Sequence, residues 1–120
     1  MHELYVAQCI LDSAEKALPD DVAGSSVREI VVLVGRLDAI VNDSLTFLFD
    51  VIKAERGFPS AALRIDVEPV SCRCLRCTEQ FAVPDVDCFF CPECNSRDVK
   101  VLTGRGIRIM EMTVEDGVEV

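Results

Sequence analysis

Apolar residues recur at intervals of three and four in two stretches of the chain, which is the period of an amphipathic helix. The first stretch covers residues 4–18, and its apolar positions are Leu4, Ala7, Leu11, Ala14 and Leu18. Pro19 follows directly and ends this helix, because a proline cannot continue it. The second helix begins at Asn42 or Asp43, either of which can act as its cap, and Gly57 fits its C-terminal cap. Its apolar positions are Leu45, Leu48, Phe49 and Ile52.

Three other stretches have the composition or the alternation of β-strands. Residues 28–34 are a β-branched run of strand length, and Gly35 closes it. Residues 63–68 alternate between apolar and charged side chains, as a half-buried strand does. The apolar face of this strand consists of Leu63, Ile65 and Val67. Residues 107–114 follow a glycine-containing turn at 104–106 and predict a third strand with a less regular pattern.

The order of these elements is helix, strand, helix, strand, cysteine-rich segment, strand. Two helices need all three strands to present a face to them if they are to form one α+β domain. The cysteine-rich segment is therefore an insertion between the second and third strands. The sequence predicts the α+β class, with two helices on a three-stranded sheet and an inserted cysteine module. We expect one domain from residues 1–70 plus 105–120 and a second from residues 71–104.

The charge balance narrows the classes of function. The 120 residues include 21 acidic and 12 basic ones, which gives a net charge of −9. Such a chain repels phosphate backbones, so we do not expect it to bind nucleic acid. No apolar run approaches the roughly 20 residues that span a bilayer, and the first residues do not have the pattern of a signal peptide. We therefore expect a cytoplasmic protein without a membrane partner, whose cysteines stay reduced.

The cysteines predict a metal site. Six of the seven lie between residues 72 and 94, and four of these form two C-x2-C pairs, Cys74 with Cys77 and Cys91 with Cys94. Two such turns facing each other supply four thiolates in a tetrahedron, which structural Zn²⁺ prefers. Pro92 stiffens the second turn, and Asn95 tolerates the left-handed conformation that often follows. We predict a zinc-ribbon-like module whose zinc is structural, because four cysteine ligands leave no open coordination position.

The remaining cysteines leave alternatives open. Cys88 is also spaced as a C-x2-C pair with Cys91, so it could replace Cys94 as a ligand. We prefer Cys94 because Pro92 and Asn95 sit where a metal-binding turn uses them. Iron could occupy a similar four-sulfur site for electron transfer, but such a module would not need the surrounding α+β domain. Cys9, Cys72 and Cys88 are interpreted as small, partly buried residues.

The chain begins with Met1-His2-Glu3, and His2 is its only histidine. On residue type alone, a histidine near a terminus is an exposed side chain without a function. The position favours a metal site, because the bulky His2 should keep Met1 from being removed. The Met1 amine and the amide and imidazole of His2 can then chelate one metal in adjoining rings, and Glu3 can add its amide or carboxylate. Such nitrogen-rich sites suit Ni²⁺ or Cu²⁺.

With both candidate sites placed, the chain resembles the HypA/HybF family of hydrogenase nickel-incorporation proteins. The resemblance covers essentially all 120 residues. Its motifs are Met1-His2-Glu3-Leu4, Val34-Gly35-Arg36, Ser44-Leu45-Thr46-Phe47, Cys72-Arg73-Cys74-Leu75-Arg76-Cys77 and Cys91-Pro92-Glu93-Cys94. Tyr5 and Cys88 depart from the family's pattern, and neither is a predicted ligand.

The resemblance implies a nickel-binding α+β domain and a zinc-binding domain. It places Ni²⁺ on Met1, His2 and Glu3, and Zn²⁺ on Cys74, Cys77, Cys91 and Cys94. The family delivers nickel during maturation of [NiFe]-hydrogenase and in some organisms also of urease, with a HypB-type GTPase and the hydrogenase large-subunit precursor as partners. We expect a carrier and not an enzyme, present as a monomer or a homodimer. The rival hypothesis is a zinc-ribbon protein-interaction module without a nickel function.

Overall fold

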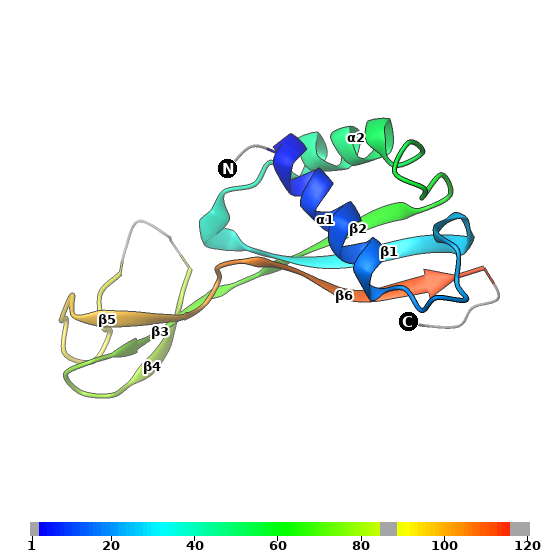
Figure 1. The fold of residues 1–120 in the computed structure, drawn as a ribbon. Coiled ribbons are helices and arrows are strands. Elements are labelled where there is room, and N and C mark those ends of the chain that lie inside the picture. Colours follow the sequence, from blue (N-terminus) through cyan, green and yellow to red (C-terminus); the bar gives the residue numbers. More distant parts are fainter. Residues whose placement is uncertain (1–2, 85–88, 116–120) are drawn as a thin grey trace. The chain divides into compact units, whose positions relative to one another are not determined.

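The computed structural model describes residues 3–84 and 89–115 (Figure 1). Its helices and strands are α1 (Glu3–Ala17), β1 (Val27–Gly35), α2 (Asn42–Ile52), β2 (Ala62–Glu68), β3 (Val70–Cys74), β4 (Gln80–Val83), β5 (Val99–Thr103) and β6 (Ile107–Val114). The chain divides into two compact units. We call Met1–Leu33, Ile40–Asp66 and Ile107–Val120 the α+β unit, and Val34–Ala39 and Val67–Gly106 the cysteine unit.

The α+β unit combines two helices with one sheet. Its three-stranded sheet has the order β2-β1-β6, and α1 and α2 pack against each other over one face of the sheet (Figure 1). The β-branched run forms β1, the central strand, because it can be buried along most of its length. The largest fully buried side chains of this unit are Leu11, Ile30, Leu45, Phe49, Phe58 and Met112. The predicted α+β class is confirmed.

The buried face of α1 differs from the predicted stripe. The buried positions are Val6, Ala7, Ile10, Leu11 and Ala14. They form two adjacent rows, and Leu4 lies at the edge of this double stripe and is 43% exposed. Among the described residues, no helix is long and apolar enough to cross a bilayer.

The two ends of α2 also differ from the prediction. Val41 occupies the N-cap position without a side-chain hydrogen bond, so neither Asn42 nor Asp43 caps this helix. The helix ends at Ile52, before Gly57, which adopts a φ of 90° in the turns that follow. The helix packs against α1, and such packing contributes more to the stability of a helix than its local capping residues do.

The cysteine unit contains a second three-stranded sheet, of order β4-β3-β5, inserted between β2 and β6 as predicted. Both pairings are antiparallel, and Cys72 lies opposite Phe81 on β4 and Val101 on β5. Cys72 is fully buried in a small core with Val70 and Val83. The sequence did not predict these three short strands.

Hydrogen bonds tie together the segments that enter and leave the cysteine unit. The N–H of Gly35 donates to the carbonyl of Gly106 at 2.8 Å. The carboxylate of Asp38 accepts the N–H of Gly106 at 2.7 Å, and that of Glu68 accepts the N–H of Gly104 at 2.8 Å. Gly35 has no room for a side chain, because a Cβ there would lie 2.3 Å from the carbonyl oxygen of Gly104. Backbone and carboxylates together fix the mutual position of these segments.

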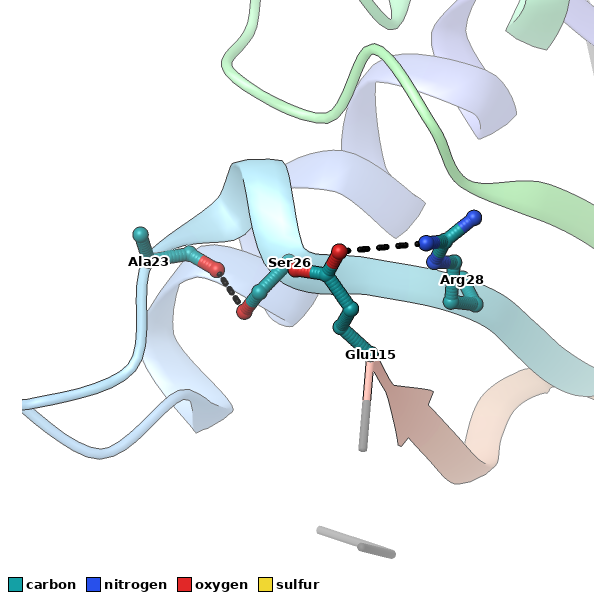
Figure 2. A network of polar contacts seen from close by, with 4 residues as sticks. All are labelled: Ala23, Ser26, Arg28 and Glu115. Carbon is teal, nitrogen blue, oxygen red and sulfur yellow. Dashed lines mark hydrogen bonds and ion pairs between the residues drawn. The ribbon is translucent and has the colours of Figure 1, made fainter. Parts of the chain in front are cut away.

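An ion pair on the surface of the α+β unit joins the start of β1 to the residue after β6 (Figure 2). Arg28 Nη2 donates to Glu115 Oε1 at 3.2 Å, and both side chains are more than half exposed. Such a pair contributes about 1 kcal/mol at most. Nearby, Ser26 Oγ donates to the carbonyl of Ala23 at 2.7 Å and closes the short 3-10 turn before β1 (Figure 2).

Candidate metal centre

The cysteine unit gathers four thiols into one cluster. The Sγ atoms of Cys74, Cys77, Cys91 and Cys94 all lie within 4.8 Å of one another. The Cys74–Cys94 and Cys77–Cys91 sulfurs are 3.5 Å and 3.4 Å apart. With Zn–S bonds of about 2.3 Å, a regular tetrahedron has S–S edges of about 3.8 Å. The donor set therefore has the composition and nearly the dimensions of a four-thiolate zinc site.

Two similar turns position these thiols. In each turn, the residue after the second cysteine donates its N–H to the carbonyl of the first. Thr78 donates to Cys74 at 3.0 Å, and Asn95 donates to Cys91 at 2.8 Å. Both donors have a left-handed backbone, with φ of 65° at Thr78 and 61° at Asn95. The prediction for Asn95 is confirmed, whereas the β-branched Thr78 gave no such signal because this conformation is rare for its type.

Backbone amides favour the thiolate form of Cys74. The N–H groups of Cys77 and Arg76 lie 3.5 Å and 3.4 Å from its Sγ. Together with hydrogen bonds from neighbouring thiols, and against the effect of burial, they lower the pKa of the Cys74 thiol from 9.0 to about 6. At Cys77 the N–H of Glu79 lowers the pKa, but the neighbouring Cys91 thiol and burial raise it further, to about 12. Without a metal, Cys74 therefore loses its proton first, and a bound cation must displace the others.

The cluster has a buried and an exposed side. Cys74 and Cys91 are buried, and Cys77 and Cys94 are exposed. The exposed pair borders a hollow that Arg76, Asn95 and Ser96 also line. A metal could therefore enter from this side without opening the core of the cysteine unit.

The other candidate residues are placed only in part. Glu3 is the first residue of α1. Met1 and His2, the other predicted nickel ligands, lie outside the described residues, and so does Cys88. Cys9 is half-buried on α1, where it lines a hollow with Tyr5, and it is not one of the four clustered cysteines.

Comparison with known proteins adds independent information. A family profile described as "Hydrogenase/urease nickel incorporation, metallochaperone, hypA" matches residues 1–114. The hydrogenase maturation factor HypA of Desulfosudis oleivorans is 32% identical over 116 residues, covering 97% of this chain and 100% of that protein. The hydrogenase maturation factor HypA of Roseiflexus sp. is 34% identical over 119 residues, covering 97% of this chain and 94% of that protein.

A solved structure shares the fold. The solution structure of the nickel metallochaperone HypA from Helicobacter pylori matches with a TM-score of 0.71 and 23% identity, covering 95% of this chain and 97% of that chain. At this identity the structural match supports the fold alone. The family profile and the relatives above 30% identity show, in addition, that the chain shares a common family with them. The chain therefore belongs to the HypA family of hydrogenase and urease nickel-incorporation metallochaperones.

Proposed function

We propose that this chain carries Ni²⁺ on Met1, His2 and Glu3 and delivers it during maturation of [NiFe]-hydrogenase, and of urease where that enzyme is present. Membership of the nickel-incorporation family carries this proposal, since the family match begins at residue 1. The start of α1 at Glu3 supports it further, because it places the backbone amide and the carboxylate of this proposed donor in the first turn of a helix.

The chemistry of these donors suits a carrier. A chelate at a chain end is selective for a metal that accepts nitrogen donors, yet a partner's ligands can displace its donors one at a time. The positive end of the α1 dipole lies at Glu3 and would weaken the binding of a cation there slightly. The carboxylate of Glu3, in the first turn of α1, offsets that effect.

Zinc has a structural part in this proposal. Cys74, Cys77, Cys91 and Cys94 would hold Zn²⁺, and the ion would cross-link the two turns of the cysteine unit. The spacing of the four sulfurs, all within 4.8 Å, supports this assignment. Because zinc binding contributes directly to folding, the metal would also order the strands that flank the cluster.

The proposed partners follow from the same role. They are a HypB-type GTPase and the hydrogenase large-subunit precursor, and the chain acts on them as a carrier and not as an enzyme. Its thiol cluster needs a reducing compartment, which favours the cytoplasm. The proposed oligomeric state is a monomer or a homodimer.

Nickel titration of untagged protein, with zinc measured in parallel, tests the proposal. One residue added before Met1 removes the free amine from the chelating position, and His2→Ala removes the only imidazole. Both changes should abolish stoichiometric nickel binding and leave zinc content unchanged, whereas Glu3→Gln should do less because its backbone amide survives. Cys94→Ala is the reciprocal control, because it should lose zinc. If the extended and His2→Ala proteins bind nickel as tightly as the parent, the zinc-ribbon interaction module becomes the better account.

A further inference from the structure

Helix α2 has two apolar faces. Leu45 and Phe49 are fully buried where α2 packs against α1. Phe47 and Val51 lie on the opposite side of the helix and are 66% and 58% exposed. Residues four apart on a helix are neighbours, with Cβ atoms about 5–6 Å apart. Phe47 and Val51 therefore form one continuous apolar surface, which we call the α2 stripe.

The fold does not require the α2 stripe. A side chain as exposed as Phe47 adds little to the core, and alanine would favour the helix by roughly 0.5 kcal/mol. Single exposed apolar residues are common in proteins, but here an aromatic and a branched residue are adjacent on one face. Phe47 also borders a hollow with Asp43, Ser44 and Leu48. A helix with this arrangement can insert its apolar side chains into a groove of another protein.

Carboxylates border the α2 stripe on one side. Asp43 and Asp50 lie four residues before and three residues after Phe47, which places them on its side of the helix. Asp50 is 51% exposed although it pairs with Lys53 at 3.2 Å. The whole chain carries a net charge of −9, which adds to the negative potential. A surface that complements this one presents cations around an apolar centre.

We propose that the α2 stripe is the docking surface for a protein partner with an apolar pocket for Phe47 that is bordered by Lys or Arg side chains. A second copy of this chain fits less well. In an antiparallel two-fold contact through the α2 stripe, each copy would bring Asp43 and Asp50 towards the same residues of the other. Like charges facing each other oppose such a contact.

The test uses the purified HypB-type GTPase of the same organism, a choice of probe that rests on the proposed function. Phe47→Ala should weaken its binding at least roughly 20-fold, as truncation of a buried aromatic anchor does. Asp43→Lys should slow association and reduce its dependence on salt. Met110→Ala is the matched control, because Met110 is 53% exposed on β6 of the same unit and should leave the affinity unchanged.

Circular dichroism and nickel titration of each variant separate this proposal from the previous one. The variants should fold and bind nickel like the parent, because none of them changes the first three residues. If the parent protein does not bind nickel, the carrier proposal is wrong. The docking proposal would still be decided by the binding of the GTPase to the parent and to the Phe47 variants. The docking surface is wrong if Phe47→Ala and Phe47→Asp bind the GTPase like the parent, or if the parent does not bind it. It is also wrong if Phe47→Asp converts a dimer into a monomer in sedimentation, since the α2 stripe would then join two copies of this chain.

Discussion

Replacing Gly35 by alanine should destabilise the cysteine unit by about 3 kcal/mol, a large share of a typical domain's stability. The new Cβ would lie 2.3 Å from the carbonyl oxygen of Gly104, 2.4 Å from its carbonyl carbon and 2.5 Å from Arg105 Cα. All three are backbone atoms and cannot rotate away as a side chain could. The two segments would have to separate by roughly 1 Å to reach ordinary contact distances.

The magnitude follows from what that separation breaks. The N–H groups of Gly35 and Leu37 donate to the carbonyls of Gly106 and Gly104 at 2.8 Å and 2.9 Å. Each bond is worth about 1 kcal/mol net, and the overpacking adds roughly 1–3 kcal/mol. Gly35 has φ of −65° and ψ of 133°, which suits alanine, so the substitution regains about 0.5 kcal/mol by restricting the unfolded chain. With an overpacking cost of about 1.5 kcal/mol the sum is about 3 kcal/mol, and the two hydrogen bonds are its largest part.

Urea unfolding with two probes measures this effect. Zinc release to a chromogenic chelator reports the cysteine unit, and fluorescence of Tyr5 reports the α+β unit, because the chain has one tyrosine and no tryptophan. Gly57→Ala is the control, since a Cβ there meets nothing within 4 Å although φ is 90°, which costs about 1–2 kcal/mol. It should shift the Tyr5 transition and leave zinc release unchanged. If Gly35→Ala releases zinc at the same urea concentration as the parent, the inferred clash is wrong.

Three further outcomes are expected. Cys94→Ala should lose zinc because only three thiolates remain, and Cys88→Ala should keep it. Metal analysis of both variants tests this, and the reverse result would make Cys88 the fourth ligand in place of Cys94. Thr78→Asn should raise the free energy of unfolding of the zinc-loaded protein by about 0.5–1 kcal/mol, because Asn tolerates the left-handed φ of 65° better than Thr. Urea unfolding measures this change, and an unchanged or lower midpoint would contradict the inferred backbone strain at Thr78. In metal-free protein the pKa of Cys74 falls from 9.0 to about 6, so its thiolate should stabilise the cysteine unit increasingly as pH rises from about 6 to 9. Above pH 9 the stability of this unit should fall, because the pKa of Cys77 is raised to about 12 in the folded state only. Urea unfolding at a series of pH values tests both trends, and a free energy of unfolding that does not change with pH would contradict them.

Local chemistry explains which features the sequence could predict. The third strand was predicted at residues 107–114, and β6 spans Ile107–Val114. The β-branched run before Gly35 became the central strand, since a strand buried along its length needs such residues. The cysteine turns were predictable because a C-x2-C spacing places two sulfurs on one side of a short turn. Each of these signals depends on residues close together in the chain.

Features that depend on distant residues left no such signal. Segment 34–39 belongs to the cysteine unit because Leu37 packs on its core and donates its N–H to the carbonyl of Gly104. Nothing in the sequence around Leu37 indicates either contact. Strand β4 has four residues, Gln80–Val83, which is too short for an alternating pattern to stand out. The N-terminal metal ligands were suggested by their position and by the resemblance to the family, and they remain a prediction because only Glu3 is among the described residues.

The order in which the strands are synthesised gives the insertion a role in folding on the ribosome. Strand β6 completes the sheet beside β1, yet the 38 residues from 69 to 106 separate it from β2. Pairing of Ser71 on β3 with Thr103 on β5 brings the ends of that span together. Shortening the effective loop from 38 residues to about five lowers its closure cost by about 2 kcal/mol. Helix α1 leaves the ribosome long before β6, so zinc captured during translation would set the moment at which the sheet of the α+β unit is completed.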